Sequence, residues 1–259
     1  MKPKKSLGQH FLTSHKIIQD MVDASLIHPS DTVLEIGPGK GILTKCLLQT
    51  GAHVIAIEKD SSLLPELGQL FEKEIEHKRL TLMCGDVLTM EIPEGKYKVV
   101  ANIPYYITGQ IIRMFLETAS QPETMSILIQ KEVADRILAR DNKESLLSLS
   151  VKIFGTPRIV RTVSPGSFNP PPTVDSAVLT ISNISRSKLG GVDEKKFFNI
   201  LHLGFAHKRK QLLPNLSLGE GNQFSKEHIQ NVFITCNLDI QSRAEDVSLE
   251  KWIELAKSL

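Results

Sequence analysis

The sequence predicts an α/β protein, with a Rossmann-like, mostly parallel seven-stranded sheet covered by helices on both faces, followed by a small all-helical domain. Seven short apolar stretches typical of buried strands alternate with segments of helical apolar spacing as far as Ser182. The polar, glycine-containing stretch "SNISRSKLGGVDEKK" then resembles a linker, and only helical spacing follows it. We therefore expect one domain over residues 1–184 and a second over residues 185–259.

The expected strands and helices alternate along the first domain. The strands cover residues 32–37, 53–58, 79–86, 97–104 and 125–130, with a closing pair at 157–163 and 176–182. A helix with Ser14 as its N-cap precedes the first strand, and a helix ending at Gly51 follows it. Asp60 is expected to cap a helix that reaches Phe71, and a further helix covers residues 108–118.

The second domain is expected to contain only helices. Their apolar spacing covers residues 195–205, a segment around Gln211, and residues 226–235 and 248–257. No internal repeat or low-complexity tract interrupts this pattern.

Composition excludes several classes of protein. No apolar run approaches the ~20 residues of a membrane span, and the basic start "MKPKKSLGQHFL" lacks the apolar core of a signal peptide. Cys46, Cys84 and Cys236 fit neither a disulfide framework nor a CxxC zinc site. We therefore expect a cytoplasmic protein that holds no metal and needs no membrane, and nothing in the sequence indicates more than a monomer.

Positive charge is clustered although the net charge is only +2. Four lysines precede the first acid, Asp20; Lys208–Lys210 are consecutive; and Arg158 and Arg161 delimit another basic stretch. One such cluster is most simply a solvated surface, but three together favour a nucleic-acid partner. The candidate RNA contacts are Lys4, Lys5, Arg113, Arg136, Lys208, Arg209 and Lys210.

A glycine-rich turn joins the first strand to the next helix. In "LEIGPGKG", Gly37, Gly39 and Gly41 allow a ligand to approach the backbone at a helix N-terminus. A dinucleotide fingerprint requires its third glycine at position 42, which is Ile42 here. The spacing therefore argues against NAD.

Acidic residues stand at three adjacent strand ends. Glu35 precedes the glycine turn, Glu58 ends the second strand, where a carboxylate reaches a ribose diol in this architecture, and Asp86 ends the third. Three carboxylates would repel a pyrophosphate but suit an adenosine joined to a sulfonium amino acid. Solvation of strand ends explains each element alone, whereas the loop, Glu58 and Asp86 together indicate S-adenosylmethionine.

The stretch "NIPYY" follows the fourth strand and suits a target adenine. The exocyclic amine of adenine is a poor nucleophile, so an enzyme must orient its lone pair with two acceptors. The Asn102 side chain offers one acceptor, and the Ile103 carbonyl, restricted by Pro104, offers the other. Tyr105 offers a face on which a flipped-out base can stack. Internal packing of the two tyrosines is the alternative, and Tyr106 fits it better than Tyr105 does.

These motifs resemble the rRNA adenine N6-dimethyltransferases of the KsgA type over nearly the whole chain. The matching stretches are "GQHFL", "EIGPGKG", "IEKD", "GD", "NIPYY", "IQKEVADRI", "FNPPPTVDSAV", "FAHKRKQLLPNL" and "SRAEDVSLEKW". The resemblance implies a methyltransferase that binds S-adenosylmethionine and releases S-adenosylhomocysteine. It implies a substrate of two adjacent adenosines near the 3′ end of small-subunit rRNA, dimethylated on a late pre-30S particle.

The resemblance also implies which residues form the site. Those expected to contact the cofactor are Gln9, His10, Leu12, Glu35, Gly37, Gly39, Gly41, Glu58, Lys59, Asp86, Val87 and Asn102. Those expected to form the target-base pocket are Asn102, Ile103, Pro104, Tyr105 and Phe168. His10 stands where the family commonly has Asn, and Pro214 interrupts a stretch that is usually more polar.

Three alternatives remain open from the sequence. A large-subunit methyltransferase of the macrolide-resistance type shares the loop and "NIPY", although "PPPTVDSAV" and the basic helical domain favour the small subunit. A ribosome-assembly factor with secondary catalysis is disfavoured by the intact Glu58, Asp86, Asn102 and Tyr105. A DNA adenine methyltransferase would need a separate target-recognition domain, and none is visible.

Overall fold

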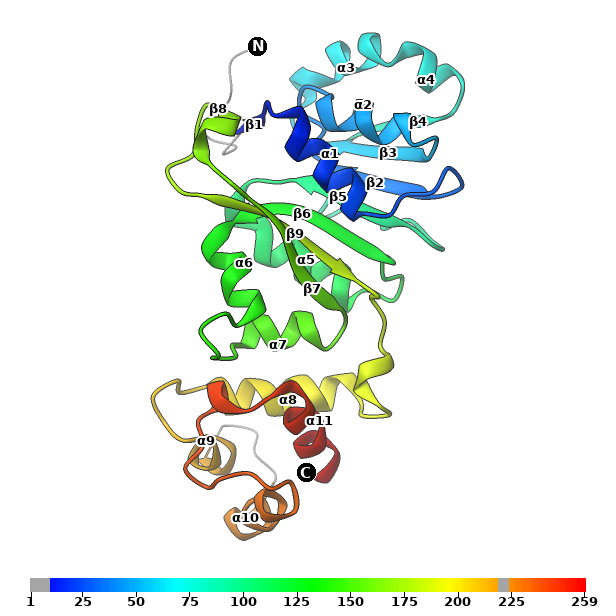
Figure 1. Cartoon of the computed structure of the whole chain (residues 1–259). Coiled ribbons are helices and arrows are strands. Elements are labelled where there is room, and N and C mark those ends of the chain that lie inside the picture. The colour runs from blue at the N-terminus through cyan, green and yellow to red at the C-terminus, as the bar shows by residue number, and fades with distance from the viewer. Residues whose placement is uncertain (1–9, 219–223) are drawn as a thin grey trace. The chain divides into compact units, whose positions relative to one another are not determined.

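The chain forms two compact units, which the computed structural model describes over residues 10–218 and 224–259 (Figure 1). The first unit comprises residues up to Ala134 together with Gly155–Ile184. The second comprises Asp135–Phe154 and Ser185–Leu259.

A seven-stranded sheet is the framework of the first unit. Its strands are β2 (Thr32–Ile36), β3 (His53–Glu58), β4 (Leu80–Cys84), β5 (Lys98–Asn102), β6 (Thr124–Gln130), β7 (Thr156–Val163) and β9 (Ser176–Ser182). The order is β4-β3-β2-β5-β6-β9-β7; β2 to β6 are parallel, and β9 runs antiparallel to both β6 and β7. The predicted α/β class and seven strands are confirmed.

The order of the strands places a ligand site. The chain moves outward from β2 to β3 and β4, then returns to pair β5 with the other edge of β2. In open α/β sheets, ligands bind beyond the carboxyl ends of the strands where the order reverses in this way. The residues that follow β2, β3, β4 and β5 therefore meet at one crevice.

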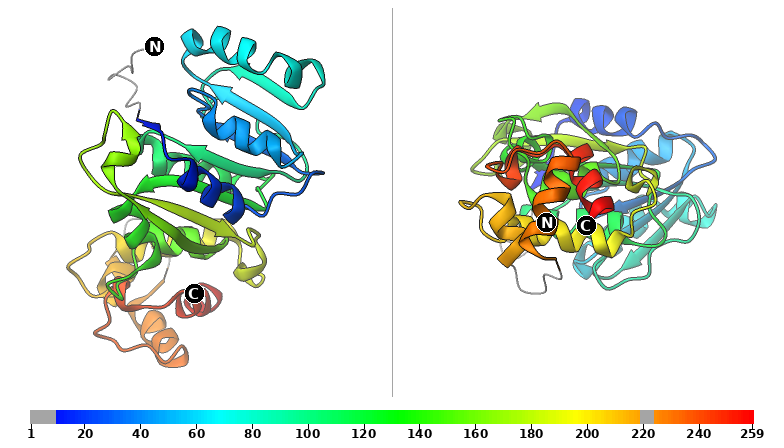
Figure 2. Two further views of the ribbon diagram at one scale, coloured as in Figure 1. Left: turned by 45° about the horizontal axis from the view of Figure 1, so that its top comes forward. Right: turned by 90° about the horizontal axis from the view of Figure 1, so that it is seen from below.

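Helices cover both faces of this sheet. They are α1 (His15–Ala24), α2 (Ile42–Gln49), α3 (Leu64–Leu70), α4 (Glu72–Glu76) and α5 (Thr108–Glu117). Helices α1 and α2 lie side by side on one face (Figures 1 and 2), and α5 lies on the other. The buried side of α1, with Ile18 and Met21, joins β2 and β3 residues in one hydrophobic core. Burial of such side chains contributes roughly 25 cal/mol per Å² of apolar surface.

A second sheet of only two short strands was not predicted. It pairs β1 (Phe11–Leu12) antiparallel with β8 (Phe168–Asn169), and places Leu12 opposite Phe168. A strand of two residues is too short to show the alternation of apolar and polar residues by which strands are predicted from sequence. Their pairing joins segments more than 150 residues apart, which no local pattern reveals.

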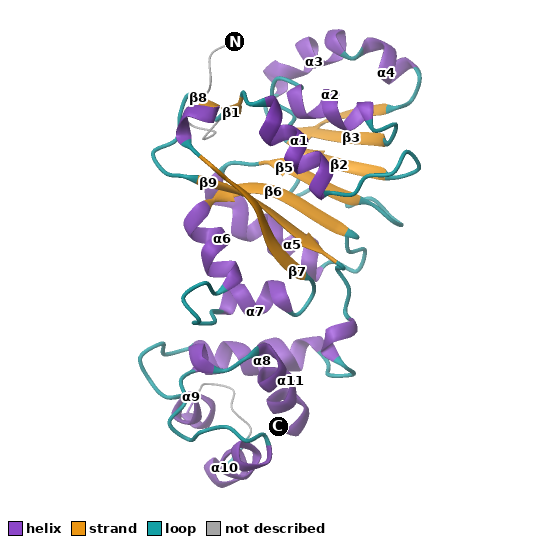
Figure 3. Ribbon diagram, viewed as in Figure 1, coloured by secondary structure: helices purple, strands orange, loops and turns teal. Residues whose placement is uncertain are grey.

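The second unit contains helices and no strands among the residues described (Figure 3). Its helices are α7 (Leu146–Lys152), α8 (Glu194–Phe205), α9 (Leu212–Leu218), α10 (Lys226–Thr235) and α11 (Leu249–Ser258), and α6 (Lys131–Leu138) spans the division between units. The side chains of Asp193, Ser225 and Ser248 cap α8, α10 and α11. Pro214 lies in the first turn of α9, a position that tolerates proline.

The division between the units differs from the expected boundary in one segment. Residues 135–154 group with the C-terminal helices, whereas the sequence prediction placed them in the first domain. The physical reason is aromatic packing: the Phe154 ring stacks on Phe198 of α8 at 5.8 Å between centroids. The guanidinium group of Arg186 lies over the Phe154 ring, 5.8 Å from the ring centroid.

Candidate functional site

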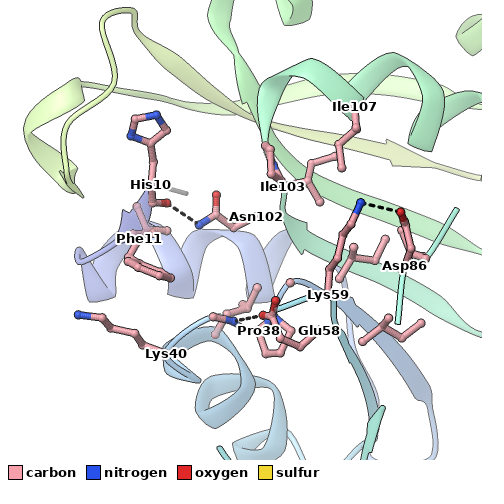
Figure 4. Close-up of a pocket in the computed structure, with 18 of the residues that line it drawn as sticks. His10, Phe11, Pro38, Lys40, Glu58, Lys59, Asp86, Asn102, Ile103 and Ile107 are labelled. Atoms are coloured by element: carbon pink, nitrogen blue, oxygen red, sulfur yellow. Dashed lines mark hydrogen bonds and ion pairs between the residues drawn. The ribbon is translucent and has the colours of Figure 1, made fainter. Parts of the chain in front are cut away.

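A cavity opens at the crevice predicted from the strand order. Its lining comes from the β1 segment, the glycine turn after β2, and the ends of β3, β4 and β5 (Figure 4). Among the predicted site residues, those that line it are His10, Leu12, Gly37, Gly39, Glu58, Lys59, Asp86, Val87, Asn102, Ile103, Pro104 and Tyr105. All of them belong to the first unit.

The glycine turn forms a backbone wall of this cavity. Gly37 and Gly39 adopt left-handed φ values of +69° and +58°, which side chains other than glycine rarely adopt. A Cβ on Gly39 would approach the Phe11 ring at 3.1 Å, so the turn is already closely covered there. Because neither glycine carries a side chain, Gly37 and Gly39 contribute main-chain atoms to the cavity lining beside Phe11.

Glu58 is held in place by main-chain donors at the end of β3. Its Oε1 accepts a hydrogen bond from the Asp60 N–H at 2.8 Å, and its Oε2 accepts one from Gly39 N–H at 3.1 Å. The side chain is almost fully buried, and burial raises the pKa of the carboxyl. Each oxygen retains capacity to accept one further donor. A vicinal diol presents two such donors.

Asp86 lies beyond the end of β4 and forms an ion pair. Its Oδ2 is 2.7 Å from the Lys59 Nζ, and its Oδ1 accepts a hydrogen bond from the Leu88 N–H at 3.1 Å. The hydrogen bond from Lys59 lowers the pKa of the Asp86 carboxyl, so the group is ionised at neutral pH. This carboxylate can accept from an amino group that enters the cavity.

Asn102 at the end of β5 has a defined amide orientation. Its Nδ2 donates to the main-chain carbonyl of His10 at 3.3 Å (Figure 4). The donor end of the amide is therefore engaged, and the acceptor oxygen Oδ1 is left for a ligand. The next residue, Ile103, is buried and also lines the cavity.

Tyr105 lines the cavity together with Asn102, and its hydroxyl and its ring each contact a neighbouring side chain. Its hydroxyl is hydrogen-bonded to the Ser176 Oγ at 2.6 Å, and burial raises the pKa of the phenol. The ring is nearly parallel to that of His10, at 16° and 6.1 Å between centroids. His10 is in turn held by a hydrogen bond from Nδ1 to the Pro170 carbonyl at 2.8 Å. Two anchored rings therefore line the cavity together with Asn102.

Three predicted site residues do not line the cavity. Glu35 is completely buried on β2, and burial raises its pKa to about 8. Gly41 instead allows packing, because a Cβ there would lie 2.6 Å from the Phe71 ring. The side chain of Phe168 is 5% exposed and lies in the hydrophobic core, because β8 pairs with β1. None of these three residues is part of the cavity lining, so their contacts with cofactor or target base stay predictions from the sequence.

Several other lining residues were not predicted from the sequence to contact a ligand. Phe11 covers the glycine turn and has the Lys40 Nζ 5.2 Å from its ring centroid. Tyr106 and Ile107 continue the "NIPYY" segment into the lining. Their position next to recognised motifs was the only available signal. Gln9, Lys4 and Lys5 lie outside the described residues.

The remaining candidate RNA contacts are exposed cations. Arg113 on α5 is paired with Glu117 at 2.8 Å, so part of its charge is neutralised locally. Arg136 is exposed on α6. Lys208, Arg209 and Lys210 form an exposed turn between α8 and α9, and no ion pair within residues 10–218 and 224–259 involves them. Among the candidate RNA contacts that the structure describes, this turn therefore carries cations that no described carboxylate neutralises.

The geometry of the cavity fits S-adenosylmethionine. The glycine turn provides main-chain contact, Glu58 suits a ribose diol, and Asp86 suits an amino group. Asn102 and Tyr105 then stand where a second, flat ligand could meet the cofactor.

Comparison with known proteins decides the family. The family model described as ribosomal RNA adenine dimethylase matches residues 1–259. The chain belongs to this family. A member acts as an S-adenosylmethionine-dependent rRNA adenine dimethyltransferase, so the predicted family, enzyme class and use of this cofactor are confirmed.

Relatives within the family match over almost the full length. Proteins named ribosomal RNA small subunit methyltransferase A are 39% identical in Dehalococcoides mccartyi, over 98% of this chain and 88% of theirs. The corresponding protein of Clostridium botulinum is 37% identical over 98% and 93%. That of Thermosynechococcus vestitus is 37% identical over 100% and 97%.

Solved structures of two methyltransferases share the fold. A dimethyladenosine transferase from Plasmodium falciparum has a TM-score of 0.82 at 28% identity, covering 95% of this chain and 96% of its own. The 23S rRNA methyltransferase ErmE has a TM-score of 0.79 at 25% identity, covering 96% and 99%. No helix in the described part of this chain is long and apolar enough to cross a membrane.

Proposed function

We propose that this family member transfers methyl groups to the N6 amines of two adjacent adenosines in the 3′-terminal hairpin of small-subunit rRNA. The product is N6,N6-dimethyladenosine, and the substrate is the rRNA within a late pre-30S particle. The observation that carries the proposal is the orientation of Asn102, whose amide oxygen is left as an acceptor because its nitrogen donates to His10.

The cofactor half of the cavity is proposed to hold S-adenosylmethionine, which supplies an electrophilic methyl group on a sulfonium centre and leaves as S-adenosylhomocysteine. The main chain at Gly37 and Gly39 would contact it closely. Glu58 would accept hydrogen bonds from the ribose hydroxyls, and Asp86 would accept one from the adenine amine of the cofactor. No metal takes part in this scheme.

The other half is proposed to position the target amine. The Asn102 Oδ1 and the Ile103 carbonyl would each accept one N6 hydrogen, so that the nitrogen lone pair, rather than a hydrogen, is directed at the methyl group. Tyr105, with its hydroxyl held by Ser176, offers a ring on which the target base can stack. Catalysis would then rest on positioning and preorganised dipoles. The displaced N6 proton would leave to water, because an alkylated amine loses it readily.

The choice of the small subunit is supported by the full-length relatives at 37–39% identity, which carry that name. The 23S rRNA remains a second candidate substrate, because the structure is also similar to that of the 23S rRNA methyltransferase ErmE. The sequence identity to ErmE is lower, at 25%. An assembly role with secondary catalysis is less well supported, because Glu58, Asp86, Asn102 and Tyr105 all line the cavity.

The exposed turn Lys208–Lys210 is proposed to contact rRNA phosphates, together with Arg113, Arg136, Lys4 and Lys5. Cations without a protein partner release counterions from RNA most effectively. We infer that the protein acts as a monomer in the cytoplasm, where pre-30S particles assemble.

The test is a methyl-transfer assay on unmodified particles. Purified protein and radiolabelled S-adenosylmethionine would be incubated separately with small and large ribosomal subunits that lack the modification. Label in small-subunit rRNA alone would support the proposal. Label in large-subunit rRNA alone would assign the protein to the ErmE-like activity. Cofactor binding without label in either RNA would favour the assembly role.

A further inference from the structure

Tyr106 differs from the other two tyrosines of the chain in its surroundings. Tyr97 is buried and its hydroxyl donates to the Ser120 carbonyl at 2.7 Å, and Tyr105 is half-buried and bonded to Ser176. Tyr106 is 66% exposed, and its hydroxyl forms no hydrogen bond within the described part of the chain. The fold therefore gains little from this ring, which argues against the alternative that Tyr106 packs internally.

The exposed ring stands at the cavity. Among the described residues, seven large apolar side chains are exposed, and Tyr106 alone of these is aromatic and lines the cavity. It belongs to a single 3₁₀ turn, Tyr105–Ile107, in which successive side chains point about 120° apart. Tyr105 thus faces Ser176 and the cavity, while the next ring, on a Cα about 3.8 Å away, is directed to solvent at its entrance.

We propose that Tyr106 is a substrate-positioning residue that stacks the adenosine next to the target in the RNA chain. This inference rests on the proposed function, in which the two substrate adenosines are adjacent. While one base occupies the cavity beside Tyr105, its neighbour remains just outside, and an adjacent ring is available there. Two consecutive tyrosines would then hold two consecutive bases, one inside the cavity and one at its entrance.

A competing occupant is the cofactor. Tyr106 and Lys59 both line the cavity, and Lys59 pairs with Asp86 at its cofactor side. The high exposure of the ring favours the RNA, because a residue that covered a bound cofactor would face inward. A measurement of cofactor affinity separates the two.

The test compares Tyr106→Ala, which removes the ring, with Tyr106→Phe, which keeps it. Leu70→Ala is the matched control, because Leu70 is 57% exposed and does not line the cavity. Initial rates of methylation would be measured at several concentrations of unmodified small subunits, which gives kcat/KM. A second set of small subunits would be reconstituted with rRNA in which one of the two adenosines is uridine, a base that stacks less strongly.

The loss of one stacked base predicts that Tyr106→Ala lowers kcat/KM on the natural particle by about 5- to 150-fold. Tyr106→Phe and Leu70→Ala should stay near wild type, and calorimetry should give all variants the wild-type affinity for S-adenosylmethionine. On the uridine-containing particle, the penalty of Tyr106→Ala should shrink, because the wild type has less stacking to lose.

Three outcomes overturn the inference. They are wild-type kinetics for Tyr106→Ala, a weakened cofactor affinity in that variant, or an equal penalty on both particles. A wild-type protein that labels only the large subunit refutes the proposed function itself, and that result is visible without any Tyr106 variant.

Discussion

Replacement of Glu58 by Gln is the most informative perturbation of the cofactor site. Both carboxylate oxygens already accept a backbone N–H, from Asp60 at 2.8 Å and from Gly39 at 3.1 Å. Glutamine keeps the shape but has one acceptor oxygen and one NH₂ group. One of the two backbone donors would therefore face another donor, and one ribose hydroxyl would lose its acceptor.

The magnitude follows from the hydrogen bonds that are lost. A hydrogen bond to a charged group contributes about 1.5–3 kcal/mol. The loss of one such bond to the cofactor weakens binding by roughly 10- to 150-fold, because 1.4 kcal/mol corresponds to a factor of ten. The donor left without an acceptor in the turn also costs about 1–3 kcal/mol of stability, so the melting temperature should fall.

The assay is titration calorimetry with S-adenosylmethionine at pH 8, because burial raises the pKa of the Glu58 carboxyl and a higher pH favours its ionised form. Glu66→Gln is the control, because it removes the same charge from an exposed position on α3. An unchanged dissociation constant for Glu58→Gln, or an equal loss in Glu66→Gln, would show that Glu58 does not bind the ribose.

Three further perturbations test the surrounding structure and the RNA contact. Gly41→Ala should lower the free energy of unfolding, measured by urea denaturation, by about 2–5 kcal/mol. Alanine would be strained at the left-handed φ of +77°, and its methyl group would lie 2.6 Å from the Phe71 ring. Glu35 has its pKa raised by burial from 4.5 to about 8. Its protonated form therefore stabilises the fold at low pH, and this contribution is lost as pH rises from 4.5 through 8. Glu35→Gln should gain stability relative to wild type across that interval and level off above it. Replacing Lys208 and Arg209 by Gln should reduce the slope of log binding constant against log salt by about 1–2 in filter-binding experiments.

Each of these has a control within the chain. Gly37→Ala also imposes a left-handed φ, of +69°, but its methyl would meet only an ordinary contact at 3.6 Å, so an equal loss in both variants would contradict the packing argument. A stability difference for Glu35→Gln that is constant from pH 5 to 8 would rule out the raised pKa. Lys96 is 89% exposed and not among the candidate RNA contacts. An equal change of slope on its replacement would mean that only net charge is being measured.

The parts of the site that follow from local rules were predictable. Glu58 and Asp86 come directly after apolar stretches, and parallel strands align their carboxyl ends at one edge. The glycine turn is a similarly local signal, since Gly37 and Gly39 require a left-handed φ. The sequence alone therefore predicts that these elements meet at one crevice.

The parts that depend on distant pairing were not predictable. Asn102 is oriented by a carbonyl 92 residues away, on His10. Phe168 is drawn into the core by a two-residue strand that pairs with Leu12. The grouping of residues 135–154 depends on Phe154 meeting Phe198. In each case a single long-range contact decides the outcome, and periodicity carries no information about it.

The measurement that tests the central claim most directly is mass spectrometry of the 3′-terminal fragment of small-subunit rRNA after reaction. Wild-type protein and Asn102→Ala would be compared at saturating S-adenosylmethionine, with the cofactor affinity of each measured in parallel. The account predicts four added methyl groups on two adjacent adenosines for the wild type, and almost none for Asn102→Ala with its cofactor affinity largely kept. Near-normal dimethylation by Asn102→Ala, or an unmodified fragment from the wild type, would contradict it.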